Sequence, residues 1–265
     1  MATPIQMLWV EGPLSALERL SMSSFLHCGH PVHLYVYGRV DNIPDGVTVL
    51  DGRSILPEER ICRYGPVAGE GKGSLALFAN LFRYALLQGK GGVWSDCDVV
   101  CLKPLDAVLA AEYVIATEYR DGARQILLAN NCFLKAPAGS PFAAECSAIA
   151  LGADPDKVGW GELGPSMVTT LVHKHGLERF LVPPWQLSPL GWWEYRRLLE
   201  EAPLPWTDSA LVVHCFNEMW RRSALDKNAR YGAHTPFELL KRRYLLDASE
   251  PAATLVAPSS VRAAP

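Results

Sequence analysis

The chain has 265 residues, with 28 acidic against 25 basic side chains, so its formal net charge is −3. Hydrophobic residues make up 49% of the chain and charged residues 20%, a globular balance that argues against disorder. Because there is no basic excess to neutralise phosphates, we expect no nucleic-acid partner.

The cysteines and the amino-terminal residues bear on the compartment. The seven cysteines are odd in number and contain no Cys-x-x-Cys pair, which favours reduced thiols over a disulfide framework or a zinc site. The first residues lack a basic segment followed by an apolar run, and no stretch approaches the roughly 20 apolar residues of a membrane span. We therefore expect a cytoplasmic protein with no integral membrane segment, for which peripheral association stays open.

In the first half of the chain, short apolar runs alternate with a helical pattern. Residues 5–10, 32–37 and 47–50 predict strands, and Pro13 favours a helix running to about Leu26. Residues 75–86 carry apolar side chains at helical spacing, with Ser74 as the expected N-cap and Gly89 as the end. Strands are then expected at 91–94 and 99–102. His27, His30 and His33 are expected at the surface.

The second half continues the alternation. Strands are expected at 113–117, 125–128 and 132–135, with Asn130 and Asn131 between the last two, where they either form a turn or contact a sugar. Helices are expected at 141–151, 165–175 and 236–244, and a late strand ends at His214. This order predicts one α/β domain over residues 1–247 with a mostly parallel central sheet flanked by helices. Residues 248–265, rich in Ala, Pro and Ser, are expected to be a disordered tail.

The most informative motif is Gly91-Gly92-Val93-Trp94-Ser95-Asp96-Cys97-Asp98. If Asp96 and Asp98 end one strand, residues i and i+2 project to the same face, and their carboxylates repel unless a cation bridges them. Such oxygen ligands suit Mn²⁺ or Mg²⁺, which can hold a diphosphate. The alternative reading is that one or both aspartates only cap a turn, and Cys97 is expected to point away from the metal.

The stretch LFRYALLQGKGGVWSDCDVVCLKPLD resembles the sugar-binding region of Asp-x-Asp glycosyltransferases. It is most similar to glycosyltransferase family 32, which includes initiating α-mannosyltransferases and α-1,4-galactosyltransferases, and to the cores of clostridial glucosylating toxins. The resemblance rests on Asn80-Leu81-Phe82-Arg83-Tyr84 followed by Gly91-Gly92-Val93-Trp94-Ser95-Asp96-Cys97-Asp98, which is similar to the family's Gly-Gly-aromatic-x-Asp-x-Asp run. It implies a GT-A-like fold and transfer of a sugar from a nucleotide-sugar donor.

The resemblance also implies roles for individual residues. Asp98 would ligate Mn²⁺ or Mg²⁺, Asp96 would hold the donor ribose and assist the metal, and His214 would complete the metal or diphosphate site. Further donor contacts are expected from a set that includes the motif glycine and tryptophan: Trp9, Asn80, Arg83, Gly92, Trp94 and Asn217. Asp98, Arg83 and Glu162 are the expected catalytic residues. Trp9, Trp94 and His214 could instead be core residues, Arg83 a surface cation, and Glu162 an ordinary helix-start acid.

One departure from the family pattern concerns Asn80. The family usually has Asp at this position, where it is thought to bind donor sugar hydroxyls together with the residue matched by Arg83. Asn can still donate and accept hydrogen bonds but carries no charge. This substitution leaves open which donor sugar is used.

The reading is therefore a metal-dependent transferase, with a UDP-sugar favoured as donor and GDP-mannose second. Its acceptor would be a glycan, a lipid-linked glycan or a protein, as in polysaccharide biosynthesis, and retention of configuration is implied by the resemblance. The main rival is a degenerate, non-catalytic nucleotide- or sugar-binding protein, motivated by Asn80. A metal-dependent phosphatase or nucleotidyltransferase is a weaker rival, because the phosphatase Asp-x-Asp normally ends the first strand and is followed by Thr.

Overall fold

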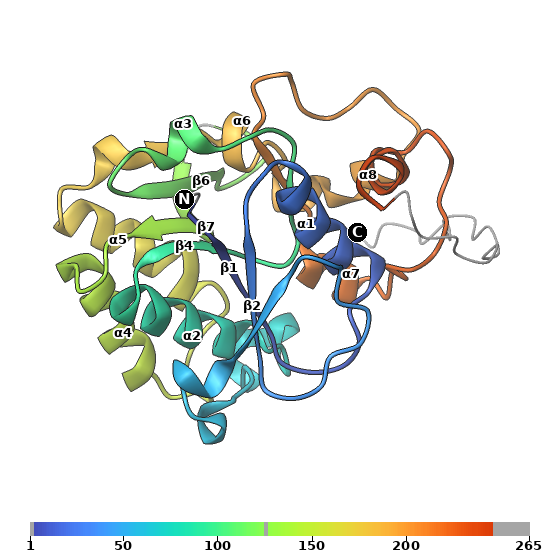
Figure 1. Ribbon diagram of the computed structural model, residues 1–265. Coiled ribbons are helices and arrows are strands. Elements are labelled where there is room, and N and C mark those ends of the chain that lie inside the picture. Colours follow the sequence, from blue (N-terminus) through green and yellow to red (C-terminus); the bar gives the residue numbers. More distant parts are fainter. Residues whose placement is uncertain (1–2, 125–126, 246–265) are drawn as a thin grey trace.

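A computed structural model describes residues 3–124 and 127–245 and contains a seven-stranded sheet in the order β3-β2-β1-β4-β7-β6-β8. Strand β1 pairs in parallel with β2 and β4, β2 with β3, and β6 with β8, whereas β7 runs antiparallel to both β4 and β6. A second, two-stranded sheet joins β5 and β9. The predicted α/β class with a mostly parallel sheet flanked by helices is confirmed, and it is consistent with the GT-A-like expectation (Figure 1).

The elements have the following bounds. The strands are β1 (Ile5–Trp9), β2 (Val32–Val36), β3 (Thr48–Asp51), β4 (Gly92–Ser95), β5 (Val99–Cys101), β6 (Val114–Tyr119), β7 (Leu127–Ala136), β8 (Leu181–Val182) and β9 (Val212–His214). The α-helices are α1 (Ala16–His27), α2 (Ala76–Gly89), α3 (Asp106–Leu109), α4 (Pro141–Gly152), α5 (Met167–Lys174), α6 (Pro184–Leu187), α7 (Asn217–Arg222) and α8 (Pro236–Tyr244).

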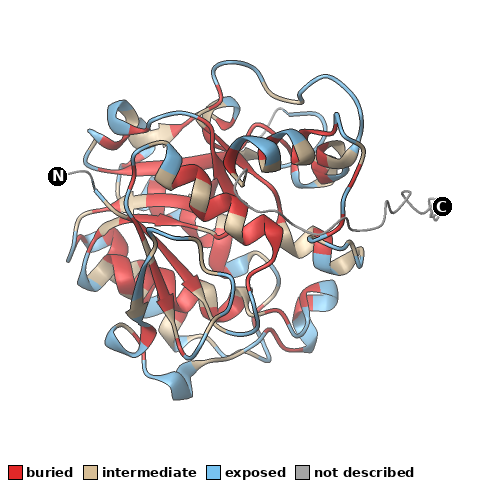
Figure 2. Ribbon diagram, turned by 45° about the vertical axis from the view of Figure 1, so that its right-hand side comes forward, coloured by how far each residue is buried: buried red, intermediate tan, exposed pale blue. Residues whose placement is uncertain are grey.

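The sheet is buried on both faces, because its side chains alternate between two cores. On β1, Ile5 and Met7 pack into a cluster with Phe25 of α1, whereas Leu8 packs with Phe78 and other residues of α2. Alternation with a period of two is what an extended strand imposes, so each face collects its own apolar set. Figure 2 shows the strands buried in the interior and the exposed surface on the outer sides of the helices.

The helices are divided between the two faces. Helices α2, α4 and α5 form one layer, and α1 lies on the other side with α7 and α8 near it (Figure 1). A third apolar cluster around Trp220 and Phe237 joins α7 and α8 to β9 and α1. Helix α1 begins with a capping box in which Ser15 and Glu18 exchange hydrogen bonds with each other's backbone N–H. No described helix is both long enough and apolar enough to cross a membrane.

Several predicted elements need correction. Helix α1 begins at Ala16, so Pro13 precedes it rather than lying in its first turn. The two strands expected at 125–128 and 132–135 are one strand, β7, although residues 125 and 126 lie outside the described part of the chain. His30 is buried, contrary to the surface prediction, because its Nε2 accepts a hydrogen bond from the N–H of Leu105. The expected tail, 248–265, also lies outside the described residues.

The turn into β4 requires glycine at position 91. Gly91 has φ 65°, and a Cβ at this position would lie 2.4 Å from the backbone nitrogen of Ala138. We expect Gly91→Ala to lower the free energy of unfolding by about 2–4 kcal/mol, because a left-handed conformation and a steric clash both oppose the methyl group.

The matched control is Gly89→Ala, two residues away in α2, where a Cβ would meet nothing within 4 Å. It should be neutral or stabilising by up to about 1 kcal/mol, because alanine is the better helix former. Urea unfolding of both variants measures the contrast, and equal stabilities would contradict the assignment.

Candidate donor and metal site

A cavity of about 830 Å³ opens beyond the carboxyl ends of β1 and β4. Its lining includes Trp9 from the end of β1, Arg83 from α2, Asp96 and Asp98 from the turn after β4, and His214 from the end of β9. Ligand sites in open α/β sheets form at this edge, because the loops that follow the strands converge there. The predicted site residues on these separate segments are therefore brought together.

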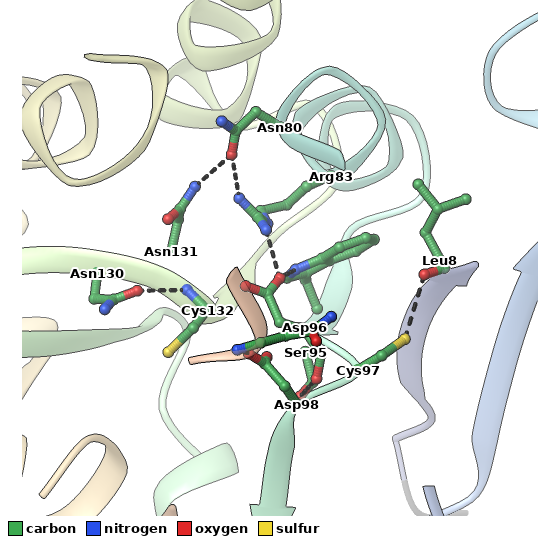
Figure 3. Close-up of polar contacts among 12 residues, drawn as sticks. Leu8, Asn80, Arg83, Ser95, Asp96, Cys97, Asp98, Asn130, Asn131 and Cys132 are labelled. Atoms are coloured by element: carbon green, nitrogen blue, oxygen red, sulfur yellow. Dashed lines mark hydrogen bonds and ion pairs between the residues drawn. The ribbon is translucent and has the colours of Figure 1, made fainter. Parts of the chain in front are cut away.

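The two aspartates converge from a turn rather than from one strand. Strand β4 ends at Ser95, and the N–H of Val99 donates to the carbonyl oxygen of Asp96 at 3.2 Å, which closes the turn before β5. The N–H of Asp96 donates to the carbonyl oxygen of Cys132 on β7 at 2.8 Å. Cys97 points away toward β1, where its thiol bonds the carbonyl oxygen of Leu8, as expected from the sequence (Figure 3).

Asp96 is held by two donors on the same oxygen. Arg83 Nη2 lies 2.5 Å from Asp96 Oδ1, and the indole N–H of Trp94 donates to that oxygen at 2.7 Å (Figure 3). The guanidinium also lies over the Trp94 ring, 4.9 Å from its centroid. Arg83 is buried, so the surface-cation alternative is wrong. Both contacts use Oδ1, so neither donor occupies Asp96 Oδ2.

Asp98 is held from the opposite side by the segment after β9. The backbone N–H of Asn217 donates to Asp98 Oδ2 at 2.6 Å, and His214 Nε2 lies 3.3 Å from the same oxygen. Burial alone would raise the pKa of Asp98, but the His214 charge and these hydrogen bonds outweigh it and hold that pKa below its usual value. Asp98 therefore stays a carboxylate at neutral pH.

The backbone that presents these groups is fixed by the small sheet. Val99 and His214 are directly paired across β5 and β9, and the N–H of Cys215 donates to the carbonyl oxygen of Asp98 at 2.9 Å. Residues more than 100 positions apart in the chain are thereby set side by side. Phe216, with φ 55°, then turns the chain so that the N–H of Asn217 faces the aspartate.

Asn80 lies in a buried hydrogen-bond network that includes the charged Arg83 guanidinium. Its Oδ1 accepts from Arg83 Nη1 at 2.6 Å and from Asn131 Nδ2 at 2.8 Å, while its own amide donates to the hydroxyl of Tyr64 at 3.3 Å. Asn131 also donates to the hydroxyl of Tyr84 at 2.9 Å. Each polar atom of the Asn80 side chain therefore has a partner, and the network fixes the side of Arg83 opposite Asp96.

Asn130 and Asn131 lie within strand β7 rather than in a turn between two strands. The register with β6 shifts between Ile115, which pairs with Leu134, and Ala116, which pairs with Asn130. A β-bulge breaks the strict alternation of faces, so two consecutive asparagines both line the cavity. Asn131 reaches the Asn80 network, and Asn130 Oδ1 accepts from the N–H of Cys132 at 2.7 Å.

Asp96, Asp98 and His214 form a group that suits a divalent cation. One ligand atom from each lies within 4.8 Å of the other two. Carboxylate oxygens with one imidazole nitrogen are hard or intermediate ligands that Mn²⁺ and Mg²⁺ accept. A cation between them would also offset the repulsion of two adjacent carboxylates. The residues that are present therefore fit the metal expected from the sequence.

The remaining predicted residues divide between the cavity and its surroundings. Trp9 and Asn217 line the cavity, and the Trp9 ring lies below Lys227 Nζ, 5.6 Å from the ring centroid. Gly92 lies outside the cavity lining, at the start of β4 beside Gln6. Glu162 also lies outside it, and its carboxylate accepts from the N–H of Gly159 at 2.8 Å, which closes its own turn.

Sequence reasoning missed several residues of the cavity wall. Glu118 lies in β6 beyond the predicted strand end, Arg120 directly follows β6, and Trp192 comes from the 3₁₀ helix Trp192–Leu199. The available signal for Glu118 was its position as the first charged side chain after an apolar strand, at the sheet edge where ligands bind. Lys227 gave no comparable signal, because it lies in an irregular segment.

Comparisons with known proteins locate one family segment. Residues 71–115 match the family described as "Glycosyltransferase sugar-binding region containing DXD motif". This span includes Asn80, Arg83 and the Asp96–Asp98 turn, so the predicted resemblance and the predicted transferase class are confirmed. A search of curated proteins found no match.

The solved structures that match this chain include two glycosyltransferases. The PaToxG glycosyltransferase aligns with TM-score 0.44 and 14% identity over 68% of this chain and 72% of its own. The apo form of the glycosyltransferase GlyE from Streptococcus pneumoniae TIGR4 aligns with TM-score 0.43 and 12% identity, over 85% of this chain and 61% of its own. The alignment thus spans less than two thirds of the GlyE chain.

The Asn80 network predicts a contrast between two substitutions. Asn80→Leu removes the acceptor of both Arg83 and Asn131, and we expect it to lower the free energy of unfolding by about 2–4 kcal/mol. Asn80→Asp retains that acceptor, and the Tyr64 hydroxyl can rotate to donate, so its stability should stay within about 1 kcal/mol of the parent. Denaturant unfolding measures both, and a loss in Asn80→Asp as large as in Asn80→Leu would contradict this account.

Proposed function

We propose that this glycosyltransferase moves a sugar from a nucleotide-sugar donor, bound with the help of Mn²⁺ or Mg²⁺, to an acceptor hydroxyl. A UDP-sugar is the favoured donor and GDP-mannose the second. The observation that carries the proposal is the convergence of Asp96, Asp98 and His214 in a large cavity. The two aspartates lie in the segment that matches the sugar-binding family, and His214 lies on β9, which pairs with β5 of that segment. A bound cation would supply Lewis-acid stabilisation to the departing nucleoside diphosphate.

The chain's own residues are assigned the following parts. Asp98 and His214 would hold the cation and the adjacent phosphate, and their positions are set by Asn217 and the β5–β9 pairing. Asp96 would bind the cation and the ribose through the oxygen that Arg83 and Trp94 leave free. Trp9, half-buried at the cavity wall, would contact the base, and Lys227 above its ring adds positive charge at that end.

Arg83 and Asn80 would orient the sugar. The Arg83 guanidinium bridges Asp96 and Asn80, so its charge lies between the nucleotide end and the asparagine network. That charge would stabilise the diphosphate as negative charge develops on it. Retention of configuration, implied by the resemblance, would need no opposed general base. In this scheme Glu162, whose carboxylate closes its own turn outside the cavity, is the weakest of the expected catalytic residues.

Metal-coupled nucleotide binding tests the proposal directly. We expect UDP to raise the thermal midpoint of the protein only when Mn²⁺ is present, because a ligand stabilises the state that binds it. Asp98→Asn should weaken UDP affinity in Mn²⁺ by at least about tenfold, since changes even to outer partners of a metal cost that much. Asp45→Asn, an exposed aspartate outside the cavity, is the control and should behave as the parent.

The assay is completed with a panel of nucleotide sugars, in which donor hydrolysis is followed with and without Mn²⁺. Turnover of one donor that is lost in Asp98→Asn would support the transferase. If every donor is inert and Asp98→Asn leaves UDP affinity unchanged, the proposal is wrong.

The second candidate is a binding protein without turnover, and Asn80 is the observation that favours it. It predicts metal-dependent UDP binding in the parent without donor turnover, and turnover on conversion of Asn80→Asp. The Asn80 oxygen holds both Arg83 and Asn131 in place, and this intact network supports the opposite expectation. We therefore expect the parent to turn over its donor and Asn80→Asp to change the preferred sugar. The donor panel applied to both proteins distinguishes the two candidates.

A further inference from the structure

Glu118 presents a carboxylate in the cavity that the donor scheme does not use. It lies on β6 and is half-buried in the cavity wall. Burial raises the pKa of this side chain, and the His214 charge and the Asn130 amide limit the rise. A carboxylate in such surroundings loses hydration, so a partner that replaces water is expected. The Glu118 carboxylate therefore indicates a ligand that the donor scheme does not include.

The carboxylate is held in one orientation by Asn130, which pairs with Ala116 and so lies on the same face of the regular β6–β7 ladder as Glu118. Asn130 Nδ2 donates to Glu118 Oε2 at 2.5 Å, and Asn130 Oδ1 is held by the N–H of Cys132. Among the described residues, no side chain bonds the other oxygen, Oε1. Asn131, which follows the register shift, reaches the donor network, whereas Asn130 stays in the regular ladder and bonds Glu118. One oxygen of Glu118 is positioned, and the other remains for a ligand.

An exposed tryptophan lies on the same side of the cavity. Trp192 lines the cavity although 46% of its surface is exposed. Its segment contacts the loop after β6, because Arg124 forms an ion pair with Glu194. The flat apolar face of an indole matches the C–H face of a sugar ring, while its large area favours stacking. Arg120, also in the cavity wall, adds a hydrogen-bond donor.

We propose that Glu118 and Trp192 form the acceptor end of the cavity and that the acceptor is a saccharide. A sugar ring would stack on Trp192, and one of its hydroxyls would donate a hydrogen bond to Glu118. This inference rests on the proposed function, since it assigns the second substrate of the same reaction. Trp9 and Lys227, which also line the cavity, are assigned to the nucleotide.

Transfer of the sugar to the acceptor requires no proton transfer to Glu118. The bond between the anomeric carbon and the diphosphate oxygen breaks, and its electron pair stays with the diphosphate. The acceptor hydroxyl oxygen forms the new bond to the anomeric carbon, and its proton passes to the departing diphosphate oxygen. Glu118 binds and orients the acceptor, so it is a specificity-determining residue whose loss should spare reaction with water.

The test separates transfer from hydrolysis. The donor that the parent hydrolyses in Mn²⁺ is offered with the methyl glycosides of galactose, glucose, mannose and N-acetylglucosamine as acceptors. We expect transfer to at least one glycoside. Glu118→Gln and Trp192→Ala should each lower that transfer by roughly tenfold or more, as expected for the loss of a hydrogen bond to a charged group or of an aromatic contact. Hydrolysis and UDP affinity should stay within about twofold of the parent.

Two control substitutions are matched in type. Glu112→Gln changes an exposed glutamate just before β6, and Trp185→Ala removes a tryptophan that is 49% exposed but does not line the cavity. Both should transfer as the parent does. Because Trp192 is exposed, its substitution should preserve folding even if Glu118→Gln does not, and thermal midpoints check this.

The outcomes are distinguishable. Parent-like transfer by both Glu118→Gln and Trp192→Ala overturns the inference. So does equal loss of hydrolysis and transfer, which would place Glu118 in donor binding. If the parent binds UDP in a metal-dependent way but neither binds nor glycosylates any of the glycosides, the saccharide assignment is wrong and the proposed function still stands. Absence of metal-dependent UDP binding in the parent overturns the proposed function itself.

Discussion

The buried ion pair between Arg83 and Asp96 is the constraint on which the site depends. A guanidinium enclosed by α2 and Trp94 would be costly without an opposite charge, and Asp96 supplies that charge. The pair ties the helix to the turn after β4 and thereby fixes one aspartate of the motif. Because Arg83 also bonds Asn80, the same cation connects the candidate metal site to the asparagine network.

The register shift in β7 is the second constraint on the site. It arises from strand pairing rather than from the Asp-x-Asp motif. Asn131, which follows the register shift, reaches Asn80, whereas Asn130 remains in the regular ladder with β6 and bonds Glu118. A regular strand would have placed one of these side chains on the opposite face. The same strand accepts the N–H of Asp96 through Cys132, which joins the bulge to the aspartate turn.

Much of the architecture could be predicted from local pattern. Period-two apolar runs located most of the strands, and the helix of residues 236–244 was placed at its observed bounds. The Asp-x-Asp run and the Arg-Tyr element identified the sugar-binding segment, because that chemistry is confined to a short stretch. Patterns of this kind survive in sequence because they depend on neighbours only a few residues away. One helix boundary expected from local pattern is wrong: Ser74 is the expected N-cap of α2, but Leu75 occupies that position.

The sequence by itself therefore determined the α/β class, the identity of the motif and its chemical type. Only the tertiary structure decided that His214 and Asn217 meet Asp98, that Asn80 bonds Arg83 and Asn131, and that Glu118 faces the cavity while Glu162 does not. The physical reason is sequence separation. Strand pairing and the bulge bring together groups that lie up to 119 positions apart, and no local periodicity encodes those contacts.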